Sequence, residues 1–255
     1  MNYKVLFKTA MLAGEIMAQS GAETFRVEDT MIRLLKTSNF QFIDVYATTT
    51  GIVSTLSDPS IEPITGVKRI SDRSNNLSRI NEVNQISRNV CEGIITVEEA
   101  YEKLLTIRNY KTYSKLTIAF ATVVATAASV GLFGGNIVDC IIAALNGMLI
   151  VSISRLSYNR VDSVFMVDVA KSFTVALMTM FCVFFFHETH SEIIIIGSIM
   201  PLVPGIPITN AVRDTLQGNY MSGTARATEA FVISLGIAIG VGAGLGLFNF
   251  IERMF

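Results

Sequence analysis

Three prolines and a glycine interrupt an apolar run that begins at Ile193, and this interruption constrains the fold more than any other feature. The stretch from Pro201 to Asp214 reads Pro-Leu-Val-Pro-Gly-Ile-Pro-Ile-Thr-Asn-Ala-Val-Arg-Asp. Each proline lacks a backbone N–H and clashes with the preceding turn, so a continuous helix cannot pass through all three. Broken backbone at membrane depth is tolerated only where it is buried in protein or lines a watery cavity. Polar side chains directly after such a break are typical of a transport site.

Charge and hydropathy divide the 255 residues into two unlike halves. Charged residues concentrate before residue 113 and long apolar runs follow. The mean hydropathy of +0.50 is therefore an average of a polar half and a strongly apolar half. We expect a small α+β domain over residues 1–112 and a mainly α transmembrane domain over residues 113–255. The N-terminus shows no signal peptide, which predicts a cytoplasmic location for the first domain. The net charge of −1 gives no reason to expect a nucleic-acid partner.

Apolar periodicity and turn residues predict two helices, three strands and two further helices in the N-terminal half. Gly21 suits the end of the first helix, and Thr24 is the expected N-cap of the second. Thr96 and Glu99 form a capping box before the last helix, and Pro63 weakens the third strand. The expected ranges are helices over 3–19 and 24–39, strands over 40–48, 52–57 and 61–70, and helices over 76–89 and 97–109.

A charged segment, Gly21-Ala-Glu-Thr-Phe-Arg-Val-Glu-Asp29, separates the first two predicted helices. Helix capping and surface ion pairs account for such a segment, and a docking or regulatory surface against the membrane domain is the functional alternative. This half has no Gly-rich phosphate loop, no Gly-x-Ser-x-Gly and no histidine. Hydrolysis here would need a histidine-free mechanism, so we do not expect an enzyme.

Five apolar runs in the C-terminal half are expected to span a membrane, the fourth of them as a broken helix. Arginines flank the inner ends of these runs at Arg155, Arg160, Arg213 and Arg226, whereas the two outer connections carry no lysine or arginine. The positive-inside rule then places the N-terminal domain inside the cell and the C-terminus outside. The expected spans are 116–133, 137–154, 163–187, 193–208 (broken) and 229–250.

Glycines recur every four residues in the last predicted span, at Gly236, Gly240 and Gly244, interleaved with Gly242 and Gly246. This spacing lets two helix backbones approach closely. The two helices in contact could belong to this one chain or to two subunits. In the second case the protein would form a higher oligomer.

Ionisable residues interrupt two of the apolar spans. Asp139 lies near the outer end of the second span, and Asp168 and Lys171 can pair on one face of the third. Ionisable groups at membrane depth are costly and usually face a cavity or a partner. We therefore take Asp139, Asp168 and Lys171 as candidate ion-coupling residues. An interfacial helix cap at Asp139 and a structural ion pair of Asp168 with a snorkelling Lys171 are the alternatives.

The residues after the proline break supply a candidate substrate site. A helix starting near Thr209 would point its positive N-terminal end towards the break, where free N–H groups can hold a carboxylate. Arg213 could pair with an anionic substrate, or with Asp214 or Glu229. The candidate substrate-binding residues are Pro204, Gly205, Thr209, Asn210, Arg213 and Asp214.

Neither the cysteines nor the histidines have metal-ligand spacing. Cys91, Cys140 and Cys182 lie far apart in the sequence and also give no disulfide framework. His187 and His190 are three residues apart, and a third ligand is missing, so a solvated turn is expected there. We expect no metal and no cofactor.

Four segments of the chain resemble the signature of the threonine/serine exporter (ThrE) family. They are the segments 21–29, Pro204–Asp214, Gly218-Asn-Tyr-Met-Ser-Gly223 and Ala225-Arg-Ala-Thr-Glu229. Members of that family occur as one long polypeptide or as two separate proteins, and this chain is similar to the larger partner of the split form, the YjjP type. The resemblance implies a bacterial inner-membrane protein that works with a small YjjB-like membrane subunit. It also implies export of threonine, serine or succinate, all of which carry a carboxylate, driven by an ion gradient that we take to be the proton gradient.

Two functions of different classes follow from these patterns. The chain could be an exporter subunit that holds the substrate carboxylate around Pro204–Asn210, compensates its charge with Arg213 and carries the coupling proton on Asp168 or Asp139. The alternative is a membrane-embedded sensor or assembly subunit whose cytoplasmic domain binds a partner through residues 23–29. An intramembrane hydrolase is disfavoured because no nucleophile–base pair supports it.

Overall fold

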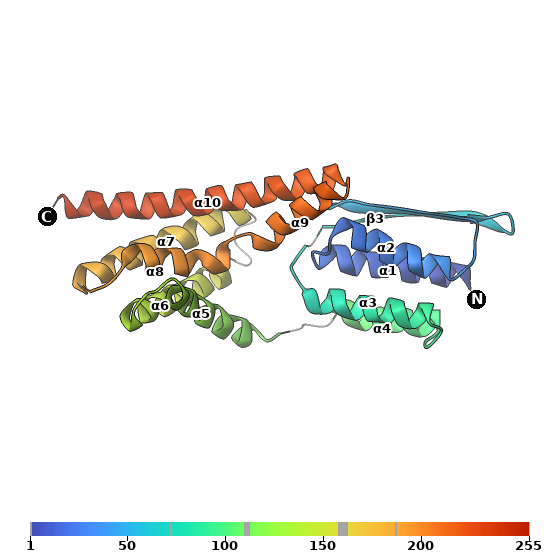
Figure 1. The fold of residues 1–255 in the computed structure, drawn as a ribbon, viewed down its shortest axis with the longest axis horizontal. Helices are drawn as coiled ribbons and strands as arrows, with labels where there is room; N and C mark the ends of the chain where they lie inside the picture. Colours follow the sequence, from blue (N-terminus) through green and yellow to red (C-terminus); the bar gives the residue numbers. More distant parts are fainter. Residues whose placement is uncertain (1, 72, 110–112, 158–162, 187, 255) are drawn as a thin grey trace. The chain divides into compact units, whose positions relative to one another are not determined.

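The computed structural model describes residues 2–71, 73–109, 113–157, 163–186 and 188–254. Its contacts divide the chain into unit 1, Met1–Thr112 with Ile206–Thr228, and unit 2, Tyr113–Gly205 with Glu229–Phe255 (Figure 1). Residues 206–228, which the sequence predicted to belong to the transmembrane domain, group by their contacts with the N-terminal residues. Two residues named in the sequence analysis, Arg160 and His187, lie outside the described residues.

Unit 1 contains all seven elements expected in the N-terminal half, with ends that differ by a few residues at most. Two later segments of the chain join them, most of α9 and the first residues of α10. The elements are α1 (Tyr3–Gln19), α2 (Thr24–Lys36), β1 (Phe42–Ala47), β2 (Gly51–Asp58), β3 (Ile61–Arg69), α3 (Leu77–Cys91), α4 (Val97–Asn109), α9 (Gly205–Leu216) and α10 (Tyr220–Glu252).

Unit 1 is layered, with α1 and α2 between the sheet and the α3–α4 pair (Figure 1). The three strands are antiparallel in the order β1-β2-β3, and the register places Tyr46 opposite Val53 and Val53 opposite Val67. β3 is an edge strand, which explains why Pro63 is tolerated there. The buried face of the sheet and the helices form one apolar core that includes Leu6, which is fully buried.

Local signals place the helix ends of unit 1, with one exception. Gly21 has φ +81°, as expected for the residue that ends α1. The capping box of α4 is confirmed, since Glu99 N–H donates to Thr96 Oγ1 at 3.2 Å and Thr96 N–H donates to Glu99 Oε2 at 2.9 Å. Thr24 is not the N-cap of α2, because it is the first helical residue and its side chain is bound elsewhere.

Unit 2 contains the remaining helices and the rest of α10. Its elements are α5 (Lys115–Leu132), α6 (Ile137–Ser157), α7 (Val164–Phe185), α8 (Ser191–Ile199) and the 3₁₀ helix η1 (Met200–Leu202). Among the described residues, four helices are long and apolar enough to cross a membrane, namely α5, α6, α7 and α10. The pair formed by α8–η1 and α9 adds a fifth if it counts as one broken span. The expected class, mainly α with about five membrane helices, one of them broken, and a small sheet near the N-terminus, is confirmed.

The helix break falls between Leu202 and Gly205. Pro201 lies in η1 and Pro204 lies in the break, whereas Pro207 lies in the first turn of α9. The first N–H groups of a helix have no intrahelical acceptor, so a proline is harmless there. The expectation that the second helix starts near Thr209 is therefore wrong, since α9 begins one turn earlier.

The glycine repeat of α10 packs against α7. A Cβ atom on Gly240 would lie 2.9 Å from Phe173 N, and one on Gly244 would lie 2.8 Å from Phe173 O. Gly236 meets the ring of Phe165 in the same way, whereas Gly242 faces open space. Close packing within the chain therefore accounts for the repeat at every fourth residue.

Gly240→Ala is expected to destabilise the protein, because the added methyl group would press on the α7 backbone. Overpacking of this kind costs about 1–3 kcal/mol. Gly242→Ala is the matched control, since it gains the same helix propensity in the same helix without a clash. Thermal unfolding midpoints of the detergent-purified full chain check this, and equal midpoints for the two variants would contradict the packing account.

Candidate functional site

In unit 1, the loop between α1 and α2 is bound by polar residues of α9 and of the start of α10. We call this set the junction cluster. Seven of its members come from the segment 21–29 and from the candidate residues after the break, and the eighth is Arg226. Its members are Gly21, Ala22, Glu23, Thr24, Asn210, Arg213, Asp214 and Arg226.

Asp214 is the centre of the junction cluster. The residue is fully buried, and its Oδ1 accepts a hydrogen bond from Thr24 N–H at 3.0 Å. Its Oδ2 accepts from Thr24 Oγ1 at 3.2 Å and from Arg226 Nε at 3.0 Å. Thr24 begins α2, so its N–H has no intrahelical acceptor, and a negative charge at that helix end is favourable. The carboxylate therefore satisfies donors from two distant parts of the chain.

Arg226 completes this arrangement from α10. Arg226 is 9% exposed, and its Nη2 donates a hydrogen bond to Ala22 O at 2.7 Å. A buried charge is tolerated when it is both paired and hydrogen-bonded, and removing one partner leaves the other charge uncompensated. Asp214 and Arg226 therefore depend on each other.

Asn210 and Arg213 bind the same loop from α9. Asn210 Nδ2 donates to Gly21 O at 2.9 Å, at the residue with left-handed backbone. Arg213 forms an ion pair with Glu23, and 54% of the Arg213 side chain is exposed. Glu23 also lies 3.8 Å from Arg26. Among the cations of the cluster, Arg213 is thus the one that solvent and solutes can reach.

The structure brings three of the six predicted substrate residues together with the segment 21–24. Arg213 pairs with Glu23, whereas the sequence had offered Asp214 or Glu229. Pro204 and Gly205 border the break, and Thr209 lies in the second turn of α9. A role of any of these residues in substrate binding stays a prediction.

Arg226 is the functional candidate that sequence reasoning missed. In the sequence, Arg226 stood out only as a positive charge beside a membrane span and as part of a family motif. The available signal was its position among the few charged residues of a 33-residue, mostly apolar helix. Such a residue calls for a buried partner, but the sequence does not say which carboxylate supplies it.

Glu28 lies on α2 within the electrostatic field of Asp214. Its Oε1 accepts a hydrogen bond from Ala47 N–H at 2.8 Å. Burial raises the pKa of the Glu28 carboxyl, the Ala47 bond opposes this, and the charges of Asp214 and Asp44 raise the pKa further.

In unit 2, Asp139 joins two helix starts. It is fully buried, and its carboxylate accepts from Asn136 N–H at 3.0 Å and from His190 N–H at 3.1 Å, while the His190 ring nitrogen Nδ1 lies 2.9 Å away. Asn136 Oδ1 accepts from Asp139 N–H in return. The helix-cap alternative therefore describes its contacts. His190, expected in a solvated turn, is instead tied to this carboxylate with its side chain 58% exposed.

Further polar groups are buried among the apolar helices of unit 2. Lys171 Nζ lies 3.1 Å from Asp168 Oδ1, as the spacing predicted, and both side chains are largely buried. Asn146 Nδ2 of α6 donates to Thr179 Oγ1 of α7 at 2.9 Å and to Ser198 Oγ of α8 at 3.0 Å. Within the described ranges, no group of three or more His, Cys, Asp or Glu residues could hold a metal ion.

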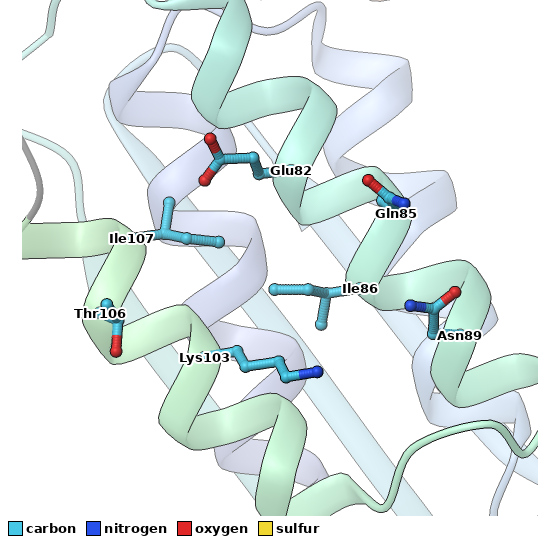
Figure 2. Close-up of a pocket in the computed structure, with 7 residues that line it drawn as sticks. All are labelled: Glu82, Gln85, Ile86, Asn89, Lys103, Thr106 and Ile107. Atoms are coloured by element: carbon cyan, nitrogen blue, oxygen red, sulfur yellow. The ribbon is translucent and has the colours of Figure 1, made fainter. Parts of the chain in front are cut away.

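A groove of about 410 Å³ lies between α3 and α4, apart from the junction cluster (Figure 2). Ile86 and Ile107 form its apolar part, and one acid and one base come from opposite helices. None of the predicted site residues lines it. The lining residues are Glu82, Gln85, Ile86, Asn89, Lys103, Thr106 and Ile107.

Comparisons with known proteins agree with the signature segments. The sequence profile of the family described as "Putative threonine/serine exporter" (ThrE) matches residues 8–248. A "Probable threonine/serine exporter" of Mycobacterium tuberculosis is 25% identical over 93% of this chain, which spans only 45% of that protein. A "Probable succinate transporter subunit YjjP" of Klebsiella aerogenes is 23% identical over 88% of this chain and 87% of that protein. No solved structure matches the chain.

Asp214→Asn is expected to destabilise the chain by about 3–5 kcal/mol, because it leaves the Arg226 charge buried and unpaired. A double-mutant cycle with Arg226→Met should show strong coupling. The matched cycle, Asp29→Asn with Arg33→Met, removes an exposed ion pair of α2 and should show coupling of about 0–1 kcal/mol. Chemical unfolding of the purified full chain measures both, and equal coupling in the two cycles would refute the central role of Asp214.

Glu28→Gln tests the electrostatics of the same site. The raised pKa means that folded Glu28 holds its proton more tightly than the unfolded chain does, so stability falls as pH rises from the ordinary value of 4.5 through the folded pKa. Glutamine stays neutral and can still accept from Ala47 N–H. The unfolding midpoint of Glu28→Gln relative to the unmodified chain should therefore increase with pH in that window. A difference that does not change with pH would contradict the raised pKa.

Proposed function

The chain belongs to the ThrE family of putative threonine/serine exporters, and from this premise we propose that it is one subunit of a secondary transporter that exports a small carboxylate-bearing metabolite. The observation that carries the proposal is the set of polar and charged side chains buried inside the apolar helices of unit 2. Polar groups are costly at membrane depth and usually mark a substrate or ion pathway. The proposed substrates are threonine and serine or a succinate-like dicarboxylate.

We place the protein in the bacterial inner membrane with its N-terminal residues in the cytoplasm. The apolar helices α5, α6, α7 and α10 support the multi-pass arrangement. The distribution of arginines supports the orientation, because it would place Arg155, at the end of α6, and Arg213 and Arg226 in cytoplasmic segments, as the positive-inside rule requires.

A second, small membrane subunit of the YjjB type completes the proposed transporter. The Klebsiella relative is named a transporter subunit, and this chain spans less than half of the mycobacterial relative. Both facts support a pathway that needs further helices from a partner.

Arg213 is the residue that we assign to the substrate carboxylate. It is half exposed and its ionic partner is Glu23, so an anion could replace the Glu23 carboxylate. Asn210 and Asp214 would hold the segment in place through their bonds to the loop 21–24. Thr209, on the same helix as Arg213, would complete the site.

Asp168 and Asp139 are the proposed carriers of the coupling proton, with Lys171 as the partner of Asp168. Both carboxylates are buried in unit 2, and each has a cationic or titratable partner that could compete with a proton. No nucleotide motif offers another energy source.

The alternative function is a membrane-embedded sensor or assembly subunit that binds a partner through residues 23–29. The junction cluster favours this alternative, because Glu23 and Thr24 are bound to α9. A change in the position of α9 would therefore change this segment, and a partner bound to the segment would act on α9.

Efflux from vesicles preloaded with labelled threonine, serine or succinate tests the proposal. Each label is measured with this chain alone and with a small YjjB-like partner co-expressed. Efflux that requires the partner supports the two-subunit exporter, and the label that moves identifies the substrate. Efflux from this chain alone would contradict the need for a partner. No efflux of any label would favour the sensor alternative.

Arg213→Gln should raise the substrate concentration for half-maximal efflux by about tenfold or more, because a charge-assisted bond to the carboxylate is lost. Arg26→Gln is the matched control, since Arg26 also pairs with Glu23 and is equally exposed. Equal effects of the two substitutions would remove Arg213 from the substrate site.

Asp168→Asn should abolish efflux driven by a proton gradient while the protein still inserts into the membrane, because asparagine cannot carry the proton. Substrate exchange without a gradient is measured in the same vesicles as a control. Unchanged gradient-driven efflux would exclude Asp168 from coupling.

A further inference from the structure

Asn146, Thr179 and Ser198 form a buried polar cluster that neither the family nor the proposed transport site explains. The three residues come from α6, α7 and α8 and are fully buried inside unit 2. Asn146 is the tenth of the 21 residues of α6, so the cluster lies near the middle of an apolar helix. The amide nitrogen of Asn146 donates to both hydroxyl oxygens.

The oxygen of the same amide is the unusual atom. Asn146 Oδ1 is buried and has no hydrogen-bond partner among the residues that the structure describes. A buried hydrogen-bond acceptor without a donor reduces the stability of the fold, and native proteins rarely contain one. Rotation of the amide by half a turn would place Oδ1 beside both hydroxyl oxygens, so that oxygens from three helices converge on one point. The cluster therefore has the capacity to bind a ligand that seeks oxygen atoms.

The location of Ser198 favours a positively charged ligand. Ser198 lies in the last turn of α8, immediately before η1 and the break at Pro204. The C-terminal end of a helix carries a partial negative charge, and broken helix ends in membrane transporters coordinate cations. Pro201 has no N–H, so the carbonyl of Gly197 lacks its regular α-helical donor and adds to this polarity.

The chemistry of the side chains selects a monovalent cation. Amide and hydroxyl oxygens are hard, neutral ligands, and none of the three side chains takes up a proton near neutral pH. Divalent ions prefer carboxylates. The closest carboxylate along α6 is Asp139, seven residues and thus about 10.5 Å away along the helix, where it binds Asn136 and His190.

Close helix packing closes the cluster off. A Cβ atom on Gly147 would lie 2.9 Å from Val123 Cα, and one on Gly197 would lie 2.7 Å from Val130 N, so α5 presses against both α6 and α8 beside the cluster. In such a site the cation loses its hydration shell and depends on protein oxygens.

From these observations we propose that Asn146, Thr179 and Ser198 form a binding site for a dehydrated monovalent cation, with Na⁺ as the best match to a small set of neutral oxygens. The site does not depend on the proposed transport function, because binding can be measured without efflux.

Thermal unfolding of the detergent-purified full chain tests the site. The midpoint is measured in sodium, lithium, potassium and choline chloride at one ionic strength, and then over a range of Na⁺ concentrations. A cation that binds only the folded state raises the midpoint as its concentration rises. We expect Na⁺ to raise it relative to choline.

Thr179→Val removes one oxygen with almost no change of shape and should weaken the apparent Na⁺ affinity by about tenfold or more. Thr174→Val is the matched control on α7, since Thr174 is only half-buried and its hydroxyl donates to Ala170 O of its own helix. This variant should keep the full Na⁺ response. Ser198→Ala provides a second test if Thr179→Val does not fold.

Two results would overturn the proposal. An unmodified chain with the same midpoint in every chloride salt would leave only a hydrogen-bonded contact or a water site among the three helices. An equal Na⁺ response in the unmodified chain, Thr179→Val and Ser198→Ala would place the cation elsewhere.

Discussion

The buried carboxylate of Asp214 is the interaction on which the rest of unit 1 depends. Thr24 and Arg226 each donate to it. The Thr24 N–H begins a helix and has no intrahelical acceptor, and the Arg226 guanidinium is buried. Arg226 then holds Ala22 O, and Asn210 holds Gly21 O. A single charge therefore joins the loop before α2 to the elements that follow the proline break. The strength of a buried, fully satisfied pair makes this joint rigid.

The helices of unit 2 are mostly apolar, and in a lipid environment the hydrophobic effect does not drive such helices together. Glycines on α6, α8 and α10 allow close approach to neighbouring helices, and buried polar side chains give the contacts direction. Asp139 with His190 and Asp168 with Lys171 pair along or between these helices. The same groups that order the helices also have the chemistry to bind an ion.

The elements were predictable from the sequence because periodicity, caps and turn residues act locally. The capping box at Thr96 and the left-handed Gly21 needed nothing beyond a few neighbouring residues. The start of α9 was misplaced because Pro207 was read as part of the break, although the first turn of a helix accepts proline. The observed break, between Leu202 and Gly205, lies within the proline-rich stretch where the sequence predicted it.

The candidate site was only partly predictable, because its partners lie far apart along the chain. Thr24 and Asp214 are separated by 190 positions, and Arg226 and Ala22 by 204. Local rules assigned Thr24 to a helix cap and left Arg226 without a partner. His190 was missed for the same reason, since its carboxylate is 51 positions away. The residue types showed which groups need a partner, but only the three-dimensional structure shows which partner each group has.

The amide hydrogen exchange of Thr24 tests the central role of Asp214 most directly. Thr24 is the first residue of α2, so its N–H has no acceptor within the helix, and the Asp214 carboxylate is what protects it. Exchange measured at this residue in the purified full chain should be as slow as that of the buried core of unit 1, and Asp214→Asn should accelerate it strongly. Fast exchange in the unmodified chain, or a rate unchanged by Asp214→Asn, would contradict the account.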